Sequence, residues 1–127
     1  MPSRLRRWPP KRLGLLLAAL ALALAAPAAA QASWGAIAIE PETGAKGIAS
    51  GKATVAVAKE AAKNRCGDPH CKVAVWVFNG WGATVQKKNG VYVSGLGKTR
   101  AKAFANARKR ANESSARSIA SVFSGLS

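Results

Sequence analysis

The chain contains few of the side chains that usually carry out chemistry. Its 127 residues include five Asp and Glu, one His and two Cys. A closed structural zinc site normally needs four ligands, and acid–base or nucleophilic catalysis needs titratable groups that support one another. The composition therefore argues against a zinc-stabilised domain and leaves few candidates for a catalytic site.

Aromatic residues are scarce as well, at 6%, and alanine supplies much of the hydrophobic fraction of 49%. This predicts a thin core that is rich in small residues. The hydrophobic fraction is still too high for a chain that is disordered throughout. At roughly 100–200 residues per domain, the length allows one domain and excludes two independent cores.

Positive charge is what the chain has in excess. Twenty Lys and Arg give a formal net charge of +15 at pH 7. Such a charge favours anionic partners, which include nucleic acid, lipid headgroups and acidic polymers.

The first 32 residues resemble a secretory signal peptide in composition. Five basic residues and no acid lie in residues 1–12, and the apolar residues 13–26, almost all Leu and Ala, follow them. This apolar run is shorter than the roughly 20 residues that span a bilayer. An uncleaved membrane anchor is the competing interpretation.

Small residues after Pro27 provide the cleavage site. Both Ala28-x-Ala30 and Ala30-x-Ala32 fit the small-x-small pattern, and we expect cleavage after Ala32, with Ala30 as the alternative. The product is a secreted or periplasmic domain of residues 33–127 without a transmembrane segment. Its net charge falls to +10, because the removed segment holds five cations and no acid.

The exported part contains an imperfect internal repeat. The first copy opens with WGAIA at residues 34–38, and the second opens with WGATV at residues 81–85. A Gly-Lys pair follows in each copy, at residues 51–52 and 97–98, and an alanine-rich stretch comes next.

We predict a single α+β domain with the order hairpin, helix, strand, hairpin, helix. Two degenerate hairpin–helix repeats and a central strand form a small antiparallel sheet that packs against two helices. Asn89-Gly90 is the strongest turn signal. The expected helices span residues 53–65 and 100–113, the second with Thr99 as its N-cap and Phe104 in the core.

Two further segments are assigned from their apolar residues. Residues 72–79 are apolar on both faces, which is typical of a central strand that is buried on both sides. For the same reason Trp76 and Trp81 are expected in the core. Residues 116–123 are expected to resume a helix, anchored by Ile119, Val122 and Phe123.

Both cysteines lie in the stretch from Cys66 to Cys71, separated by a Gly-Asp-Pro turn. In an oxidising compartment we expect them to form a disulfide between the first helix and the next strand. A metal site with His70 is the alternative, but it offers at most three local ligands. The spacing is not that of a Cys-x-x-Cys redox pair.

Together these motifs resemble a bacterial secreted family, domain of unknown function 4189. The matching residues are 34–38, the helix that ends in Cys66, and residues 71–73, 78–80 and 97–101. The resemblance implies a small exported domain supported by disulfides, and it implies no catalytic residues.

The chain departs from the family near its C-terminal end and is identified as a truncated, cysteine-poor member. Trp81 and Asn112 stand where the family usually has cysteines. The cysteine-containing strand that usually follows the last helix is expected to be missing, with residues 114–127 in its place.

We expect a non-catalytic binding module for anionic envelope components, such as a polymer or a lipid headgroup, with no cofactor. Sequence-specific binding of nucleic acid is not expected, because no known motif for it is present. The expected anion-binding residues cluster in the second repeat: Lys87, Lys88, Lys98, Arg100, Lys102, Arg108, Lys109 and Arg110.

Three other interpretations compete with this one. The basic residues can serve solubility alone. The domain can instead bind a protein of the envelope, as an inhibitor, an immunity factor or an interaction protein. Catalysis is the third, and we expect none: Asp68 and His70 are the one imaginable acid–base pair, and no nucleophile accompanies them.

Overall fold

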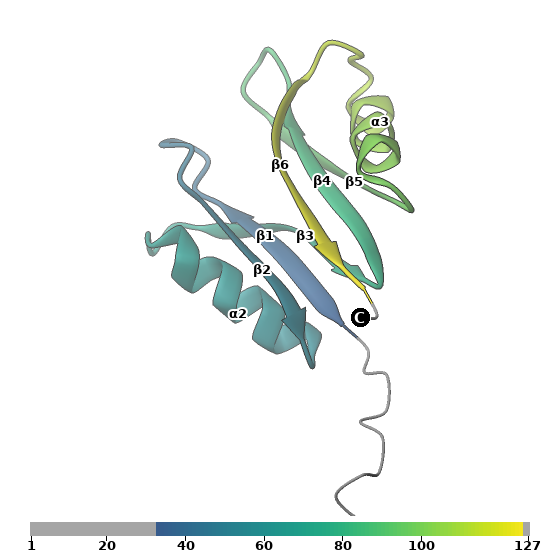
Figure 1. Cartoon of the computed structure of the whole chain (residues 1–127). Coiled ribbons are helices and arrows are strands. Elements are labelled where there is room, and N and C mark those ends of the chain that lie inside the picture. Colours follow the sequence, from purple (N-terminus) through teal and green to yellow (C-terminus); the bar gives the residue numbers. More distant parts are fainter. Residues whose placement is uncertain (1–32, 126–127) are drawn as a thin grey trace, which may run out of the picture.

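The computed structural model of the protein describes residues 33–125, and the expected signal peptide of residues 1–32 lies outside the described residues. Six strands and two helices follow one another along this part of the chain (Figure 1). Their order is β1 (Trp34–Ile39), β2 (Lys46–Lys52), α2 (Val55–Cys66), β3 (Lys72–Phe78), β4 (Gly80–Gln86), β5 (Tyr92–Gly97), α3 (Arg100–Ala111) and β6 (Arg117–Ser124).

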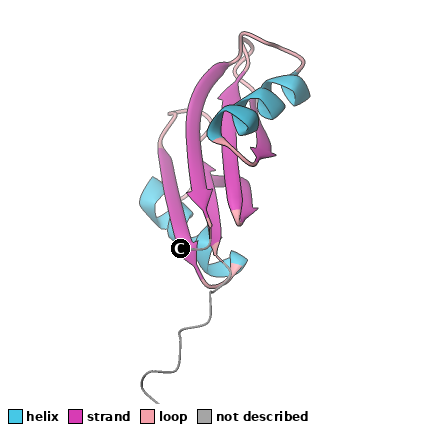
Figure 2. Ribbon diagram, turned by 45° about the vertical axis from the view of Figure 1, so that its right-hand side comes forward, coloured by secondary structure: helices cyan, strands magenta, loops and turns pink. Residues whose placement is uncertain are grey.

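The strands form two antiparallel three-stranded sheets of the same topology. The N-terminal sheet has the order β2-β1-β3, and the C-terminal sheet has the order β5-β4-β6. In each, a hairpin leads into a helix, and a third strand then returns beside the first. The sheets stack face to face with one helix on each outer side, which gives four layers (Figures 1 and 2).

Three apolar layers hold the four structural layers together. Ile and Val side chains meet between the sheets, whereas the layer under each helix consists mainly of alanine. Gly47 and Gly95 each face a helix so closely that a Cβ would lie 2.2 Å from the Ala62 carbonyl oxygen or 2.3 Å from the Ala107 nitrogen. The scarcity of large side chains therefore allows each helix to lie directly on its sheet.

Local sequence accounts for where the helices begin and end. Thr54 and Thr99 cap α2 and α3 by accepting the N–H of the residue three positions on. Thr99 is the N-cap predicted from sequence. Gly67 and Asn112 end the helices in left-handed backbone conformation.

The α+β class is confirmed, but the expected single sheet with β3 at its centre is wrong. β1 is the strand that pairs on both sides, and β3 lies at an edge. Val75 and Val77 on one face of β3 are buried between the sheets, while Trp76 and Phe78 on the other face remain 48% and 49% exposed. β3 therefore has apolar residues on both faces although only one face is buried, and Trp76 is not in the core.

The end of the chain forms a strand, which corrects two expectations. Residues 116–123 do not resume a helix, and the strand after the last helix is present as β6, without a cysteine. Ala120, Val122 and Ser124 are buried in alternation and face the N-terminal sheet or its end. This spacing of two residues is that of a strand.

Close packing of α3 on β5 makes a test of the fold. We expect Gly95→Ala to lower the free energy of unfolding by about 2 kcal/mol or more, because the new methyl group would push the helix backbone away. Gly82→Ala is the matched control, since its Cβ would meet side chains at 3.5 Å, an ordinary contact distance. Chemical denaturation of both variants measures the difference, and equal stabilities would contradict the packing.

Candidate functional site

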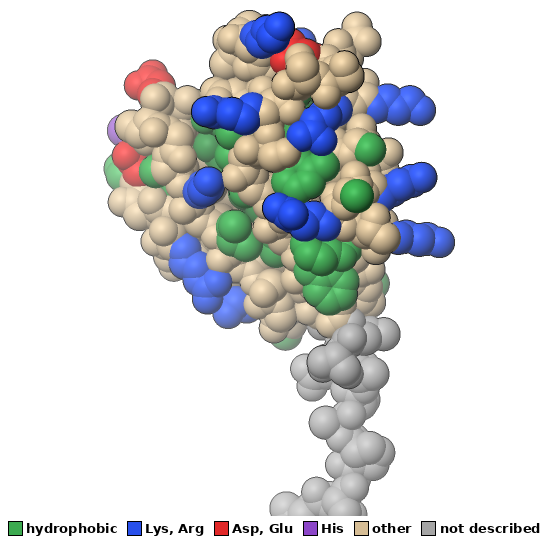
Figure 3. All heavy atoms as spheres, turned by 45° about the horizontal axis from the view of Figure 1, so that its top comes forward, with side chains coloured by type: hydrophobic (Ala, Val, Ile, Leu, Met, Phe, Trp, Pro, Cys, Tyr) green, Lys and Arg blue, Asp and Glu red, His purple; other side chains and the backbone are tan. Residues whose placement is uncertain are grey.

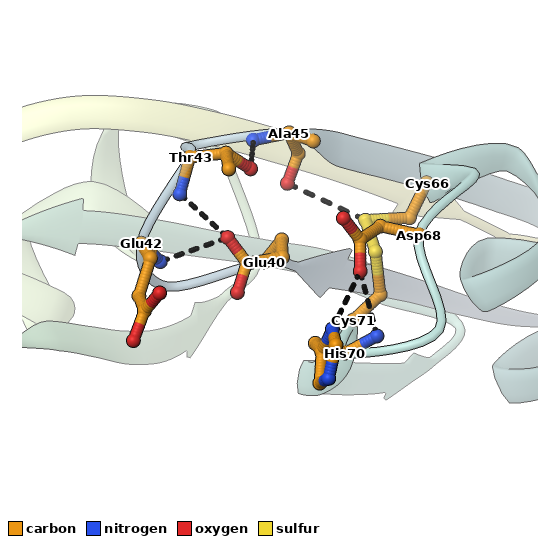
Figure 4. A network of polar contacts seen from close by, with 8 residues as sticks. All are labelled: Glu40, Glu42, Thr43, Ala45, Cys66, Asp68, His70 and Cys71. Carbon is orange, nitrogen blue, oxygen red and sulfur yellow. Dashed lines mark hydrogen bonds and ion pairs between the residues drawn. A yellow bond between two sulfur atoms is a disulfide. The ribbon is translucent and has the colours of Figure 1, made fainter.

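The cysteine loop is a structural link at one end of the molecule. Cys66 and Cys71 form a disulfide, as expected, and join the end of α2 to the residue before β3 (Figure 4). The Cys66 sulfur also lies 3.4 Å from the Ala45 carbonyl oxygen, beside the β1–β2 turn. Closing so short a loop contributes about 2 kcal/mol in the chain-entropy model.

The same loop contains the one pair that sequence suggested for acid–base chemistry. Asp68 Oδ1 accepts the His70 backbone N–H at 2.8 Å and lies 3.1 Å from His70 Nδ1 (Figure 4). The His70 side chain is 81% exposed. Within residues 33–125, no hydroxyl or thiol group is hydrogen-bonded to His70. The contacts are those of an Asp side chain that orders its own turn.

Glu40 is a nearly buried carboxylate at the end of β1. Its Oε2 accepts the backbone N–H of Thr43 at 2.5 Å and that of Glu42 at 2.9 Å (Figure 4). These hydrogen bonds, those of Thr43 foremost, favour the charged form and hold the pKa of Glu40 below its ordinary value, although burial acts in the opposite direction. Glu40 therefore fixes the β1–β2 turn in its ionised form.

This makes the turn sensitive to pH. Because the pKa of Glu40 is lower in the folded than in the unfolded chain, its contribution to stability is present above the unfolded value of about 4.3 and is lost as the pH falls through the folded value. We expect Glu40→Gln to lower the thermal unfolding midpoint at pH 7 and the difference from the wild type to shrink toward pH 3. The exposed Glu42→Gln is the control, and a pH-independent effect of Glu40→Gln would contradict the prediction.

The eight basic residues expected to bind anions do not form one patch. Lys87 and Lys88 lie at the β4–β5 turn, which is at the C-terminal end of α3, because the Lys88 N–H donates to Glu113 at 2.9 Å. Lys98 lies at the opposite end, just before α3. The two groups are therefore separated by the length of the helix.

The other five residues belong to α3, and their side chains leave the helix in different directions. Arg100 donates to Ser121 Oγ at 3.0 Å and Arg108 to the Ala116 carbonyl at 2.9 Å, so both reach toward β6. Arg110 reaches the opposite way and donates to the Ser94 carbonyl on β5 at 3.2 Å. Lys102 and Lys109 are exposed and project from the outer face of the helix.

None of these cations is neutralised by an internal partner. In the described part of the chain, the one ion pair joins His70 and Asp68, so no Lys or Arg lies within 4.0 Å of a carboxylate. Four of the five carboxylates, those of Glu40, Glu42, Asp68 and Glu113, lie at one end of the sandwich, which we call the acidic end. Cations lie at this end as well, among them Lys46, Lys72, Lys88 and Arg117. Figure 3 shows the acidic side chains in the upper part of the view and basic side chains both there and over the rest of this face.

The sequence interpretation missed two aromatic pairs at the other end. Trp34 and Phe78 pair across β1 and β3 with ring centroids 4.7 Å apart, and Trp81 and Phe123 pair across β4 and β6 at 5.1 Å. Both Phe rings are 49% exposed. The end that carries these four residues is called the aromatic end here. In each half, the Trp lies near the start of the first strand and the Phe lies near the end of the third strand. This shared position in the sequence is the signal that could have revealed the pairs.

An open groove separates the edge strands β3 and β5. It has a volume of about 470 Å³ and is lined mainly by apolar groups, with Trp76, Tyr92 and Leu96 on its walls and Arg110 at its side. Neither strand has a partner on this side. The groove therefore exposes apolar surface and two free strand edges together.

The described residues contain neither a metal-binding cluster nor a helix that could span a membrane. Within residues 33–125, no three His, Cys, Asp or Glu side chains come together as a metal site would require. Over the same range, neither helix is both long enough and apolar enough to cross a membrane.

The chain is similar to one protein family and to one known structure. The model of a domain of unknown function, DUF4189, matches residues 34–123. The NMR structure of Rv1813c from Mycobacterium tuberculosis is 33% identical to the chain, with a TM-score of 0.56, and the similarity covers 72% of this chain and 74% of that one. No curated protein matches. The chain belongs to the DUF4189 family.

Proposed function

We propose that the domain is a non-catalytic binding module for anionic components of the cell envelope and that the α3 side of the molecule binds them. The observation that supports this is the absence of internal neutralisation. The fifteen Lys and Arg of residues 33–125 have no carboxylate within 4.0 Å. Their charge is therefore available to a ligand.

The distribution of charge supports the α3 side. Residues 80–125 hold nine Lys and Arg and a single acid, Glu113. Residues 33–79 hold six Lys and Arg and four Asp and Glu. The helix itself contains no acid. On its outer face, Lys102 and Lys109 stand beside the exposed Ala101 and Ala105. These small side chains leave room for a polyanion to approach both ammonium groups.

The proposal also includes export. Residues 1–32 would act as a signal peptide that is cleaved after Ala32, and the product would be secreted or periplasmic. The Cys66–Cys71 disulfide supports an oxidising compartment.

Cleavage has a direct measurement. The intact mass of the protein recovered from the periplasm or the medium of an expressing bacterium should equal that of residues 33–127, with the disulfide closed. The Ala32→Arg variant places a large charged residue in the cleavage site and should accumulate with a higher mass. Recovery of the uncleaved chain as the sole exported form would contradict the proposal.

We also propose that the two halves of the domain are copies of an internal repeat. Each half has the topology strand, strand, helix, strand with the first strand at the centre. The two Trp–Phe pairs occupy equivalent positions in the two halves. This interpretation accounts for the matching motifs that open β1 and β4.

A protein partner is the second candidate. The groove between β3 and β5 favours it, because an extended peptide could add to a free strand edge and place its side chains against Trp76 and Leu96. Binding through this groove would depend little on salt. That property distinguishes it from the binding of a polyanion.

Binding of a soluble polyanion tests the first proposal. We expect the exported protein to bind fluorescein-labelled dextran sulfate with an affinity that falls steeply as the salt concentration rises. Lys102→Ala/Lys109→Ala should weaken this binding by roughly 30-fold at low salt, since each cation near an anionic surface contributes about 1 kcal/mol.

The control removes the same charge from the other half. Lys63→Ala/Lys72→Ala changes two exposed lysines on α2 and β3 and should weaken binding far less. Fluorescence anisotropy against salt concentration measures both variants. Salt-independent binding, or equal losses in the two variants, would overturn the α3 assignment.

A further inference from the structure

We infer that the aromatic end docks the domain on a bilayer that contains anionic lipid. This inference rests on the proposed function and deepens it: it names an anionic bilayer among the envelope components and adds the aromatic end to the α3 side as a contact surface. It depends on the position of the aromatic pairs and on the charges around them.

A set of hydrogen bonds draws the two sheets together at this end. Ser33 Oγ lies 2.5 Å from Ser124 Oγ, and the Gly51 N–H donates to the same Ser124 oxygen at 3.1 Å. The Ser33 N–H donates to Asn79 Oδ1 at 3.2 Å, and the Asn79 N–H returns a bond to the Ser33 carbonyl. The start of β1 and the ends of β2, β3 and β6 thus meet in one place.

The aromatic pairs lie on the two outer faces of this end and are left open by the helices. α2 packs mainly on β1 and β2, and α3 packs mainly on β4 and β5. The third strands, β3 and β6, are therefore poorly covered, and Phe78 and Phe123 at their ends stay 49% exposed. The pairs therefore flank this end of the sandwich on both sides.

The charges at this end match an anionic surface. Lys52 pairs with Trp34 in the β1–β2 ladder. Lys98 comes directly after Gly97, which pairs with Trp81, and Arg100 is the first residue of α3. No carboxylate of the described residues lies here, because four of the five are at the acidic end and Glu60 is on α2. The aromatic end therefore presents cations to an anionic lipid surface with no carboxylate beside them.

The combination of Trp, Phe and basic residues suits the bilayer interface better than a polymer in solution. Indole rings occupy the headgroup region of membranes, and apolar side chains beside them enter the acyl boundary. A soluble polyanion offers nothing apolar for Phe78 and Phe123 to contact. A bilayer satisfies the rings and the cations together.

Ser33, the first described residue, lies at the aromatic end, where its hydroxyl group contacts that of Ser124. Figure 3 shows an apolar patch with basic side chains beside it on the lower part of the domain.

Co-sedimentation with vesicles tests the inference on the exported protein. We expect binding to vesicles of phosphatidylcholine and phosphatidylglycerol at 3:1 and little binding to phosphatidylcholine alone. Phe78→Ala/Phe123→Ala should weaken vesicle binding tenfold or more, since two apolar insertions are lost. Its binding to dextran sulfate should not change.

The two ligands separate the two proposals. If the wild type fails to bind dextran sulfate, the proposed function fails. If it binds dextran sulfate and Phe78→Ala/Phe123→Ala still binds vesicles as the wild type does, the docking inference alone is overturned. Phe78→Leu/Phe123→Leu keeps the apolar volume and should retain most of the vesicle binding.

A second measurement does not depend on the stability of these variants. Trp76→Phe leaves Trp34 and Trp81 as the tryptophans of residues 33–127, and lipids brominated near the headgroup should quench their fluorescence. Absence of quenching in bound protein would overturn the inference. A wild-type dimer that Phe78→Ala/Phe123→Ala dissociates would assign the aromatic end to a second copy of the chain and would also overturn it.

Discussion

Stacking of the two sheets is the constraint on which the rest of the structure depends. Each sheet has two apolar faces, and its helix covers one of them. In an isolated half of the domain, the other apolar face would be exposed to water. Ile37, Val75 and Val122 meet across the interface and close those faces against each other. With alanine under the helices, this middle layer holds most of the branched side chains. The stacking also sets the ends of both sheets side by side, which is why the two aromatic pairs lie at one end and most carboxylates at the other.

The distribution of charge follows from the same architecture. The helices lie on the outside, so cations on α3 project into solvent, with no facing element that could supply a carboxylate. Arg100, Arg108 and Arg110 instead donate to oxygen atoms of β5, β6 and the loop before β6, and these neutral acceptors leave the positive charge uncompensated. A surface of this kind attracts anions over a distance set by screening, about 8 Å at physiological salt. Binding would therefore respond to ionic strength before any specific contact is made.

Local signals in the sequence were enough for much of the fold. The Asn89-Gly90 turn, the Thr99 cap, both helices and the Cys66–Cys71 disulfide were predicted because each depends on neighbours in the chain. The stacking of the sheets depends on contacts between distant segments, whereas the apolar residues on both faces of residues 72–79 predicted a central strand. Ile119, Val122 and Phe123 have a spacing that fits one face of a helix, and this local pattern predicted a helix over residues 116–123. With β6 misassigned, Phe123 could not be placed beside Trp81, and the aromatic end could not be predicted.

The junction between the halves has a consequence for assembly. Asn79 is the single residue between β3 and β4, and its φ of 49° lies in the left-handed region. This one corner turns the chain from the first sheet into the second. With an extended backbone at Asn79, β3 would continue directly into β4 as one long strand, and each half would stack on the complementary half of another molecule. The layers under the two helices would stay within each chain, and the middle layer would form between two chains. The left-handed conformation of Asn79 is thus what lets the two halves of one chain stack on each other.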